Sequence, residues 1–251
     1  MINTQRKKEI LEFLSDVDYR SLKEIADKFN VSMNTVRRDI NELCEENLVT
    51  KFYGGVSLTQ KMDSSFKVRE TSHLEEKKKI AKHAATYIRD NDLIFIDAGS
   101  TTSQLVDYFD DEYHLTIVTN NLHIIAKIIE HENWDLIVVG SKLKRSSHSL
   151  IHVHDWDYLN NLNLNKAFLA TTGFTLKSGA TNPDNSETII KTNMMKRSDK
   201  CYLLTDSTKF GQTSLITFAK AEEFDKIITN GPISKNYIEH FEDSDTELII
   251  L

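Results

Sequence analysis

The segment S-M-N-T-V-R-R-D-I, residues 32–40, decides the fold of the first part of this chain. Its serine favours a helix start, because the hydroxyl can accept a hydrogen bond from a backbone N–H group of the first turn. Val36 and Ile40 recur at the spacing of one helix face. Arg37 and Arg38 fall on the other side, so the segment predicts a helix with a buried seam and two outward arginines. Such a helix is typical of proteins that insert a helix into a DNA groove.

The residues before this segment predict two further helices. Residues 2–15 carry isoleucine and leucine at helical spacing, with basic side chains on the other side. Ser21 and Glu24 form a capping-box pattern, in which each side chain accepts a hydrogen bond from the other residue's backbone. The helix that they open carries an apolar stripe and ends at Asn30. Two short helices joined by a tight turn make a helix-turn-helix, whose second helix contacts the major groove.

A β-hairpin is predicted after the third helix. Residues 48–58 form two short apolar runs around a Gly-Gly pair, which is typical of a hairpin turn. This hairpin would be a wing that places Lys51 and Tyr53 beside the sugar-phosphate backbone. A helix-turn-helix pattern alone also fits a small helical domain with solvated charges. Three helices and a wing in this order favour DNA binding.

Composition is that of a globular protein with ordinary cores. Of the 251 residues, 39% are hydrophobic and 27% are charged. No run of about 18 apolar residues occurs, and the first residues lack a secretory signal, so no membrane helix or export is predicted. Cys44 and Cys201 lie far apart without metal-ligand spacing. This cysteine usage favours a reducing compartment, and we expect a cytoplasmic location.

The charge distribution argues against a general attraction to nucleic acid. The net charge is −7, and residues 1–61 hold ten Lys or Arg and ten Asp or Glu. The acidity therefore belongs to the rest of the chain. Any DNA affinity of the first part must come from where its basic side chains lie.

A connector and a helix follow the predicted wing. Residues 59–72 show little apolar periodicity and are interpreted as a linker, with Phe66 and Arg69 as possible anchors. Residues 73–89 predict a helix with one apolar face. The charged run at residues 75–79 is interpreted as the solvated face of that helix.

The larger part of the chain alternates short aliphatic runs with helical patterns. The predicted strands are residues 93–96, 115–118, 136–139, 167–170, 202–204 and 226–228. Near-continuous apolar strands that alternate with helices indicate a parallel sheet covered on both faces. The predicted fold class is α/β: a small amino-terminal winged helix-turn-helix domain followed by a larger Rossmann-like parallel-sheet domain. Such sheets bind ligands beyond the carboxyl ends of their strands.

Polar segments follow four of these strands. They are D-A-G-S-T-T at 97–102, T-N-N at 119–121, T-T-G at 171–173 and D-S-T-K-F-G at 206–211. Hydroxyl, amide and backbone N–H groups with a lysine would suit a phosphorylated polyol. Turn chemistry and helix capping use the same residue types. The convergence of the four polar segments at one edge of the sheet nevertheless favours a ligand site.

Two other clusters are interpreted as structural. His148, His152 and His154 with Asp155 lack a second ligand cluster, so no metal and no cofactor is predicted. The methionine pair at residues 194–195 is interpreted as core packing.

The motifs resemble those of the DeoR family of bacterial transcriptional regulators. The first part matches its DNA-binding segment in V-S-M-N-T-V-R-R-D-I-N-E-L at 31–43 and L-V-T-K-F-Y-G-G-V at 48–56. The second part resembles its sensor domain in I-F-I-D-A-G-S-T-T, V-T-N-N, F-L-A-T-T-G and D-S-T-K-F-G. That domain is related in fold to sugar-phosphate isomerases. One departure is Tyr53, which stands where the family usually has a histidine before the two glycines.

The resemblance implies domain bounds and site residues. The bounds are 1–58 for a DNA-binding domain, 59–72 for a linker and 73–251 for an effector-binding domain. The implied DNA contacts are Ser32, Asn34, Thr35, Arg37, Arg38, Lys51 and Tyr53. The implied effector contacts are Asp97, Gly99, Ser100, Thr101, Thr102, Asn120, Asn121, Gly173, Glu187, Lys191 and Lys209. No catalytic residue is predicted.

The implied function is a repressor of a sugar-uptake or sugar-catabolism operon, controlled by a phosphorylated sugar. It would bind double-stranded operator DNA as a homo-oligomer, a dimer or tetramer, because paired half-sites need two copies of the helix. The first alternative is a sugar-phosphate isomerase-like enzyme with an attached nucleic-acid-binding module, using Asp97, Asp206 or Glu187 as base. Residues 173–180, G-F-T-L-K-S-G-A, lack the acidic segment that such isomerases carry there. The second alternative is a winged helix that binds only protein.

Overall fold

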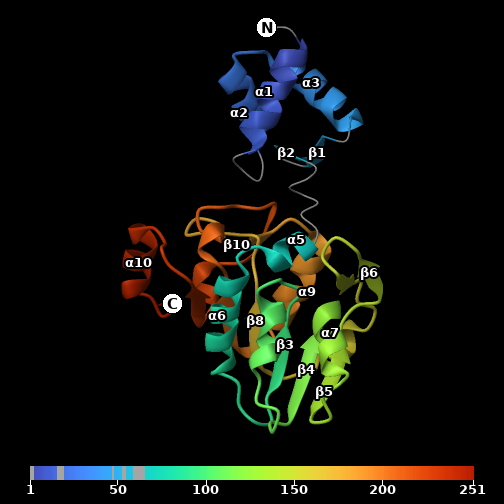
Figure 1. Cartoon of the computed structure of the whole chain (residues 1–251), viewed down its shortest axis with the longest axis vertical. Helices are drawn as coiled ribbons and strands as arrows, with labels where there is room; N and C mark the ends of the chain where they lie inside the picture. Colours follow the sequence, from blue (N-terminus) through green and yellow to red (C-terminus); the bar gives the residue numbers. More distant parts are fainter. Residues whose placement is uncertain (1–2, 16–19, 47, 53–54, 59–65) are drawn as a thin grey trace. The chain divides into compact units, whose positions relative to one another are not determined.

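The structure is a computed structural model that describes residues 3–15, 20–46, 48–52, 55–58 and 66–251. The chain divides into two compact units, Met1–Ser64 and Ser65–Leu251 (Figure 1). In the part of the chain that is described, no helix is both long and apolar enough to cross a membrane.

The first unit has three helices and a hairpin. They are α1 (Asn3–Ser15), α2 (Leu22–Phe29), α3 (Met33–Glu45), β1 (Val49–Phe52) and β2 (Gly55–Leu58). The expected capping box is present: the Ser21 hydroxyl accepts from Glu24 N at 3.1 Å, and the Glu24 carboxylate accepts from Ser21 N at 2.7 Å. The unit's core comprises Ile10, Leu14, Ile25, Ala26, Val36, Ile40, Leu43, Val49 and Val56. These residues come from all five elements, so the helices and the wing share one core.

An ion pair between Arg6 and Asp39 fixes α1 against α3. Asp39 is buried, with only 1% of its side chain exposed. Arg6 donates from Nε to one carboxylate oxygen at 2.5 Å and from a terminal nitrogen to the other at 2.9 Å. This bidentate contact raises the pKa of Arg6. The aspartate of the R-R-D-I motif therefore orients α3, and the preceding arginines are left on its outer face.

We expect Arg6→Gln to destabilise the first unit by about 3 kcal/mol, because it leaves the Asp39 carboxylate buried without a cation. The matched control is Lys7→Gln, whose ammonium pairs with Glu42 and Glu46 nearer the surface. That change should cost much less, because ion pairs near the surface contribute little to stability. Hydrogen exchange of the α3 amides measures both effects in the full chain. Equal effects of the two variants would contradict the proposed role of the Arg6–Asp39 pair.

The second unit is built on a seven-stranded sheet with order β14-β13-β11-β8-β3-β4-β5. Its strands are β3 (Leu93–Ile96), β4 (Leu115–Thr119), β5 (Trp134–Val138), β8 (Leu164–Leu169), β11 (Ser198–Leu204), β13 (Lys226–Thr229) and β14 (Glu247–Ile250). Every neighbouring pair is parallel. The chain runs from β3 outward to β5 and then returns to the other side of β3 at β8. This reversal makes the β3–β8 border the topological switch point, where sheets of this type bind ligands.

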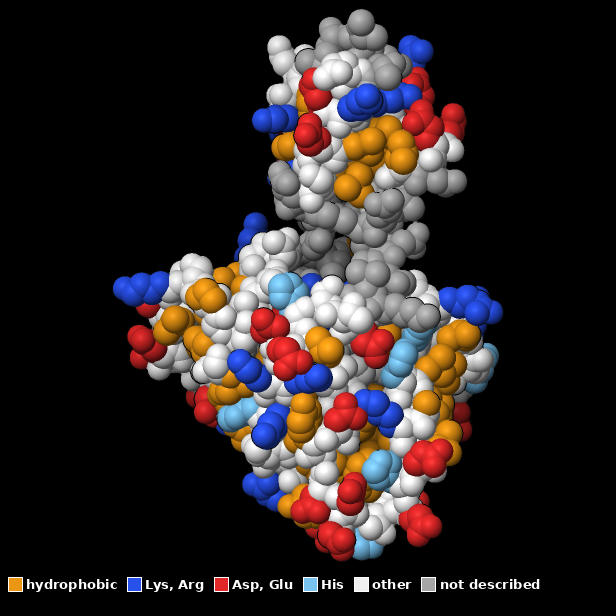
Figure 2. Space-filling model, viewed as in Figure 1, with side chains coloured by type: hydrophobic (Ala, Val, Ile, Leu, Met, Phe, Trp, Pro, Cys, Tyr) orange, Lys and Arg blue, Asp and Glu red, His pale blue; other side chains and the backbone are white. Residues whose placement is uncertain are grey.

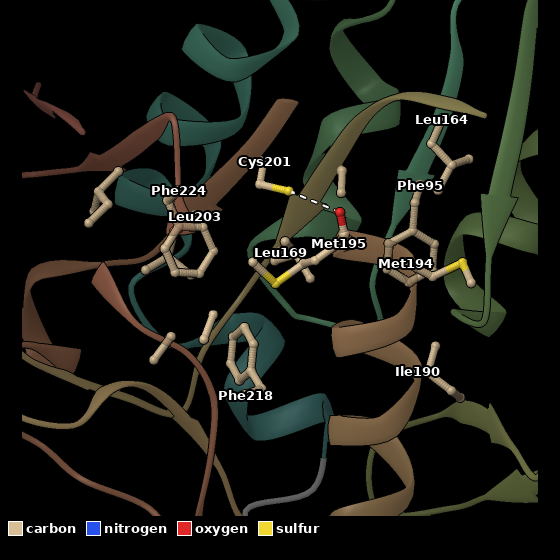
Figure 3. Close-up of a cluster of buried hydrophobic side chains, with 14 of the residues drawn as sticks. Phe95, Leu164, Leu169, Ile190, Met194, Met195, Cys201, Leu203, Phe218 and Phe224 are labelled. Carbon is tan, nitrogen blue, oxygen red and sulfur yellow. Dashed lines mark hydrogen bonds between the residues drawn. The ribbon is translucent and has the colours of Figure 1, made fainter. Parts of the chain in front are cut away.

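Each face of the sheet has its own core. On one face, Phe95 packs with Ile190 and Met194 of α9 (Asn185–Met195) (Figure 3). On the other face, Ile94 and Ile96 pack against α6 (Leu74–Ala85). Successive residues of β3 thus point to opposite layers, as a doubly covered sheet requires. The methionine pair at residues 194–195 is buried in the first of these cores, as predicted.

Shorter elements surround the sheet. The antiparallel ones are β9 (Gly173–Thr175), β10 (Gly179–Asn182) and β12 (Ile216–Ala219), and the hairpin β6 (Lys142–Lys144) and β7 (Ser149–Ile151). The helical ones are α5 (Phe66–Thr71), η1 (Thr102–Tyr108), α7 (Leu122–Ile128), α8 (Trp156–Asn160), η2 (Ser207–Lys209), η3 (Ala221–Glu223) and α10 (Lys235–Glu242). On the face of the second unit seen in Figure 2, acidic and basic side chains are interspersed.

Two sequence-based interpretations differ from the structure. The predicted linker 59–72 includes a helix, α5, and Phe66 is fully buried within the second unit. The interpretation of residues 75–79 as a solvated face is wrong for Lys77, which is 3% exposed. Lys77 is buried because its ammonium donates to the backbone carbonyls of Arg69 and Ser72, which satisfy the charge away from water.

Candidate functional site

The outer face of α3 presents a free arginine. Asn34, Arg37, Arg38 and Asn41 are exposed on it. Arg38 donates to Glu42 one helical turn later, at 3.1 Å. Arg37 makes no hydrogen bond or ion pair with any residue that the structure describes. Of the two predicted arginines, Arg37 is therefore the one whose guanidinium needs no rearrangement to meet a ligand.

The other predicted DNA contacts have partners or lie outside the described residues. The Ser32 hydroxyl accepts from Thr35 N at 3.2 Å and lies 2.9 Å from the Thr35 hydroxyl. These two side chains cap α3, so their first role is to start the helix. Lys51 donates to Asn41, which ties β1 to α3. Tyr53 lies outside the described residues.

In the second unit, Asp97 organises the turn after β3. One carboxylate oxygen accepts from Gly99 N at 3.0 Å and from the Thr102 hydroxyl at 2.6 Å. The other accepts from Ala170 N at 2.9 Å and from the Lys191 ammonium. Asp97 and Lys191 are both buried. The pair thus joins the ends of β3 and β8 to α9 across the switch point.

Close packing explains why glycine stands at residue 99. A Cβ atom added there would lie 2.3 Å from the Cβ of Ala170, which is far inside contact distance. The next two N–H groups, of Ser100 and Thr101, have no acceptor among the described residues. The turn therefore needs a glycine to fit against β8 and leaves backbone donors free beside it.

A small hollow, partly open to solvent, lies at the carboxyl ends of β3 and β4. Its lining residues are Asp97, Ala98, Asn120, Glu187, Ile190 and Lys191. Asn120 is 3% exposed and donates to the carbonyl of Leu150 at 3.0 Å. Its side-chain oxygen is buried without a donor in the described part of the chain. A buried acceptor of this kind is uncommon and fits a ligand hydroxyl.

Glu187 closes one side of the hollow and is itself held by protein donors. Lys144 donates to one of its oxygens at 3.1 Å, and Ser149 donates to the same oxygen at 3.4 Å. Asn182 donates to the other oxygen at 3.2 Å. The Glu187 charge is therefore paired before any ligand binds.

The structure brings only some of the predicted effector residues together. Asp97, Asn120, Glu187 and Lys191 line the hollow, and the turn of residues 99–102 lies next to it. The remaining three do not line it: Asn121, Gly173 and Lys209. Asn121 is fully buried and caps α7 by accepting from His123 N at 2.9 Å. Helix capping, which uses the same residue types as a ligand site, thus accounts for Asn121.

His148 belongs to a packing cluster with His123 and Phe66. His148 and His152 both have positive φ, 48° and 59°, and flank the strand β7. His148 Nδ1 lies 2.8 Å from His123 Nε2, and both rings stack on Phe66. Within the described residues, no group of three or more His, Cys, Asp or Glu side chains could hold a metal ion.

Three cations of the second unit that make contacts described here or below were not predicted as site residues. Lys144 holds Glu187, while Arg69 and Lys77 lie on α5 and α6. Sequence reasoning placed Arg69 only as a linker anchor. The signal that was available is its place three residues after Phe66, the spacing of neighbours on one helix face.

A winged helix-turn-helix joined to a parallel-sheet unit with a polar hollow defines a class: DNA-binding transcription regulators with a ligand-sensing domain. Residues 6–62 match the DeoR-like helix-turn-helix domain, and residues 72–231 match the DeoR C terminal sensor domain. The chain belongs to the DeoR family of transcriptional regulators.

Individual relatives agree with this assignment. The chain is 39% identical over 236 residues to the HTH-type transcriptional regulator IolR of Bacillus subtilis (strain 168), covering 94% of each chain. It is 28% identical over 233 residues to the glycerol-3-phosphate regulon repressor of Escherichia coli (strain K12), covering 92% of each. Among solved structures, ribose 5 phosphate isomerase A from Neisseria gonorrhoeae is 12% identical with a TM-score of 0.40, over 54% of this chain and 53% of that one. The last likeness is too distant to bear on function.

Proposed function

We propose that the chain represses a sugar-uptake or sugar-catabolism operon and that a phosphorylated sugar controls its DNA binding. The observation that carries the ligand site is the hollow at the strand ends, with the unpaired oxygen of Asn120 in its wall. A sugar hydroxyl supplies the donor that this oxygen lacks. The free N–H groups of Ser100 and Thr101 supply donors for an anion beside it.

The relatives support both halves of this proposal. The name of the Escherichia coli relative joins repression to a phosphorylated polyol, glycerol 3-phosphate. In this chain, α3 with its free Arg37 is the element that contacts operator DNA. We propose that two copies act together, because operator half-sites lie about one helical turn of DNA apart.

We propose structural roles for two of the carboxylates that line the hollow. The Asp97 carboxylate accepts from four protein donors, and Glu187 accepts from three. Their function is to place Lys191, Lys144 and the surrounding turns. The ligand then meets Asn120 and backbone groups within a fixed frame.

The same contacts weigh against an isomerase. A general base must be free to take a proton from the substrate carbon. Asp97 and Glu187 are paired with lysines, and Asp206 accepts from Thr208 N at 3.1 Å as the cap of η2. Turnover of a phosphosugar, detected as proton exchange with solvent, would revive the enzyme hypothesis. Failure to bind DNA from its own upstream region at low salt would favour the protein-binding alternative.

A thermal-shift screen of phosphorylated sugars tests the site. A ligand at 100 times its dissociation constant should stabilise the chain by about 2.7 kcal/mol. We expect Asn120→Ala to reduce this shift through the lost acceptor. The exposed Lys196 at the end of α9 provides a control, and Lys196→Ala should keep the full shift. A panel that stabilises neither the wild type nor any variant would contradict the sensor function.

A further inference from the structure

The helix α5 is the first element of the second unit and is fixed to it by Phe66. This side chain is fully buried, and its backbone N–H donates to Ser146 O at 3.0 Å. Its ring stacks on His123 with 4.3 Å between ring centroids. The segment that follows the DNA-binding unit in the chain is therefore packed against the sensor domain, close to α7 and the β6–β7 hairpin.

The end of α5 is held by a buried lysine. Lys77 of α6 donates to the carbonyls of Arg69 and Ser72, the latter at 2.7 Å. Burial lowers the pKa of Lys77 to about 8, although the negative charge of Asp206 acts in the opposite direction and raises it. The charge of Lys209 lowers it further, so these two lysines lie in one neighbourhood. Lys77 thus holds the end of α5, within electrostatic reach of the loop after β11.

Arg69 brings an unpaired positive charge to the same region. Its Nε atom is buried without an acceptor, and its guanidinium makes no ion pair within the described part of the chain. Burial lowers the pKa of Arg69, while the charges of Glu187 and Asp97 raise it. Both of these carboxylates line the hollow, and each already has a lysine of its own. Arg69 is not among the residues that line the hollow. It lies within electrostatic reach of two carboxylates that do line it, and its Nε donor has no acceptor among the described residues.

We propose that Arg69 binds the anionic group of the effector and that Lys77 holds α5 in the position that presents it. A buried Nε donor without an acceptor is unfavourable, and a phosphate offers the bidentate partner that the guanidinium geometry fits. The inference rests on the proposed function, because it names a ligand residue for the same effector and the element on which binding acts.

This arrangement gives the effector a route to the DNA-binding unit. A ligand shifts an equilibrium only by its different affinity for two states. Contact with Arg69 makes effector affinity depend on whether α5 is docked. Because α5 follows the DNA-binding unit in the chain, the element that senses the anion is also the one nearest to that unit in sequence.

The test uses inorganic phosphate as the probe on the full chain, with sodium chloride at equal ionic strength as reference. Phosphate should raise the melting temperature of the wild type and slow hydrogen exchange over residues 66–72. Arg69→Gln should weaken phosphate binding on the order of tenfold to a hundredfold, as expected for a lost charged hydrogen-bond pair. The matched control is the exposed Arg197 after α9, where Arg197→Gln should leave phosphate affinity unchanged.

The outcomes separate this inference from the proposed function. Wild-type phosphate affinity in Arg69→Gln overturns the role of Arg69, while loss of the sugar-phosphate shift in Asn120→Ala would leave the sensor function standing. If circular dichroism shows that Arg69→Gln is unfolded, Arg69→Lys is the variant to test. Lysine keeps the positive charge but lacks the paired N–H donors of the guanidinium. That variant should bind phosphate more weakly than the wild type, and equal binding overturns the inference. A wild type that responds neither to phosphate nor to any phosphorylated sugar overturns both.

Discussion

Asp97→Asn should lower the stability of the second unit by at least about 3 kcal/mol, the order expected when one partner of a buried ion pair is removed. The change leaves the Lys191 ammonium buried without a counter-charge, since both side chains are at most 8% exposed. It also replaces an oxygen that accepts from two donors. For a unit of this size, a loss of about 3 kcal/mol corresponds to a fall of ~6–12 °C in melting temperature, which calorimetry measures directly.

A double variant is the control for this prediction. Asp97→Asn combined with Lys191→Met removes the stranded charge as well, so it should recover a large part of the lost stability. If Asp97→Asn instead kept the wild-type melting temperature and lost only the ligand-induced shift, Asp97 would be an effector contact and not a structural residue. The two roles thus give opposite results in the same experiment.

Arg37→Ala should abolish specific operator binding while the ligand-induced rise in melting temperature stays intact. Arg37 is exposed and without a protein partner among the described residues, so its five N–H donors are available to a guanine edge or a phosphate. Each bidentate base contact contributes about 1–3 kcal/mol. For two copies on one operator the loss doubles. Fluorescence anisotropy with operator and with unrelated DNA separates specific from general binding.

Arg38→Ala is the matched comparison on the neighbouring residue. Arg38 already donates to Glu42, so DNA must compete with that ion pair for the guanidinium. Its loss should therefore weaken operator binding less than the loss of Arg37. Normal operator affinity in Arg37→Ala would exclude α3 as the recognition helix.

Features that depend on neighbours in the chain were predictable. The capping box of Ser21 and Glu24 and the cap of α3 by Ser32 each involve residues three apart. The buried strands of the sheet were also identified, because their aliphatic runs are continuous. The strand β14 was missed, since at the edge of the sheet its residues Glu247–Ile250 are partly exposed and carry a weaker apolar signal.

Features that depend on distant partners were not predictable. Asp39 is buried because Arg6, 33 residues earlier, neutralises it. Asp97 was predicted as an effector contact from its motif, but its partners Ala170 and Lys191 lie 73 and 94 residues further along the chain. Lys77 lies in a run of charged residues, so its burial was not expected. The backbone carbonyls that accept hydrogen bonds from its ammonium belong to a segment that was interpreted as a linker. Local patterns located the site at the strand ends, whereas long-range pairing decides which of its residues remain free for a ligand.

One measurement tests the central claim most directly: operator DNA bound to the full chain is titrated with a phosphorylated sugar and, separately, with the same sugar without phosphate. Anisotropy reports the fraction of DNA bound. The proposed mechanism predicts that at least one phosphorylated sugar changes operator affinity, that its unphosphorylated form does not, and that Arg69→Gln loses the response while keeping operator binding in the absence of ligand. Operator affinity that stays constant with every phosphorylated sugar, or that responds equally to the unphosphorylated forms, would contradict it.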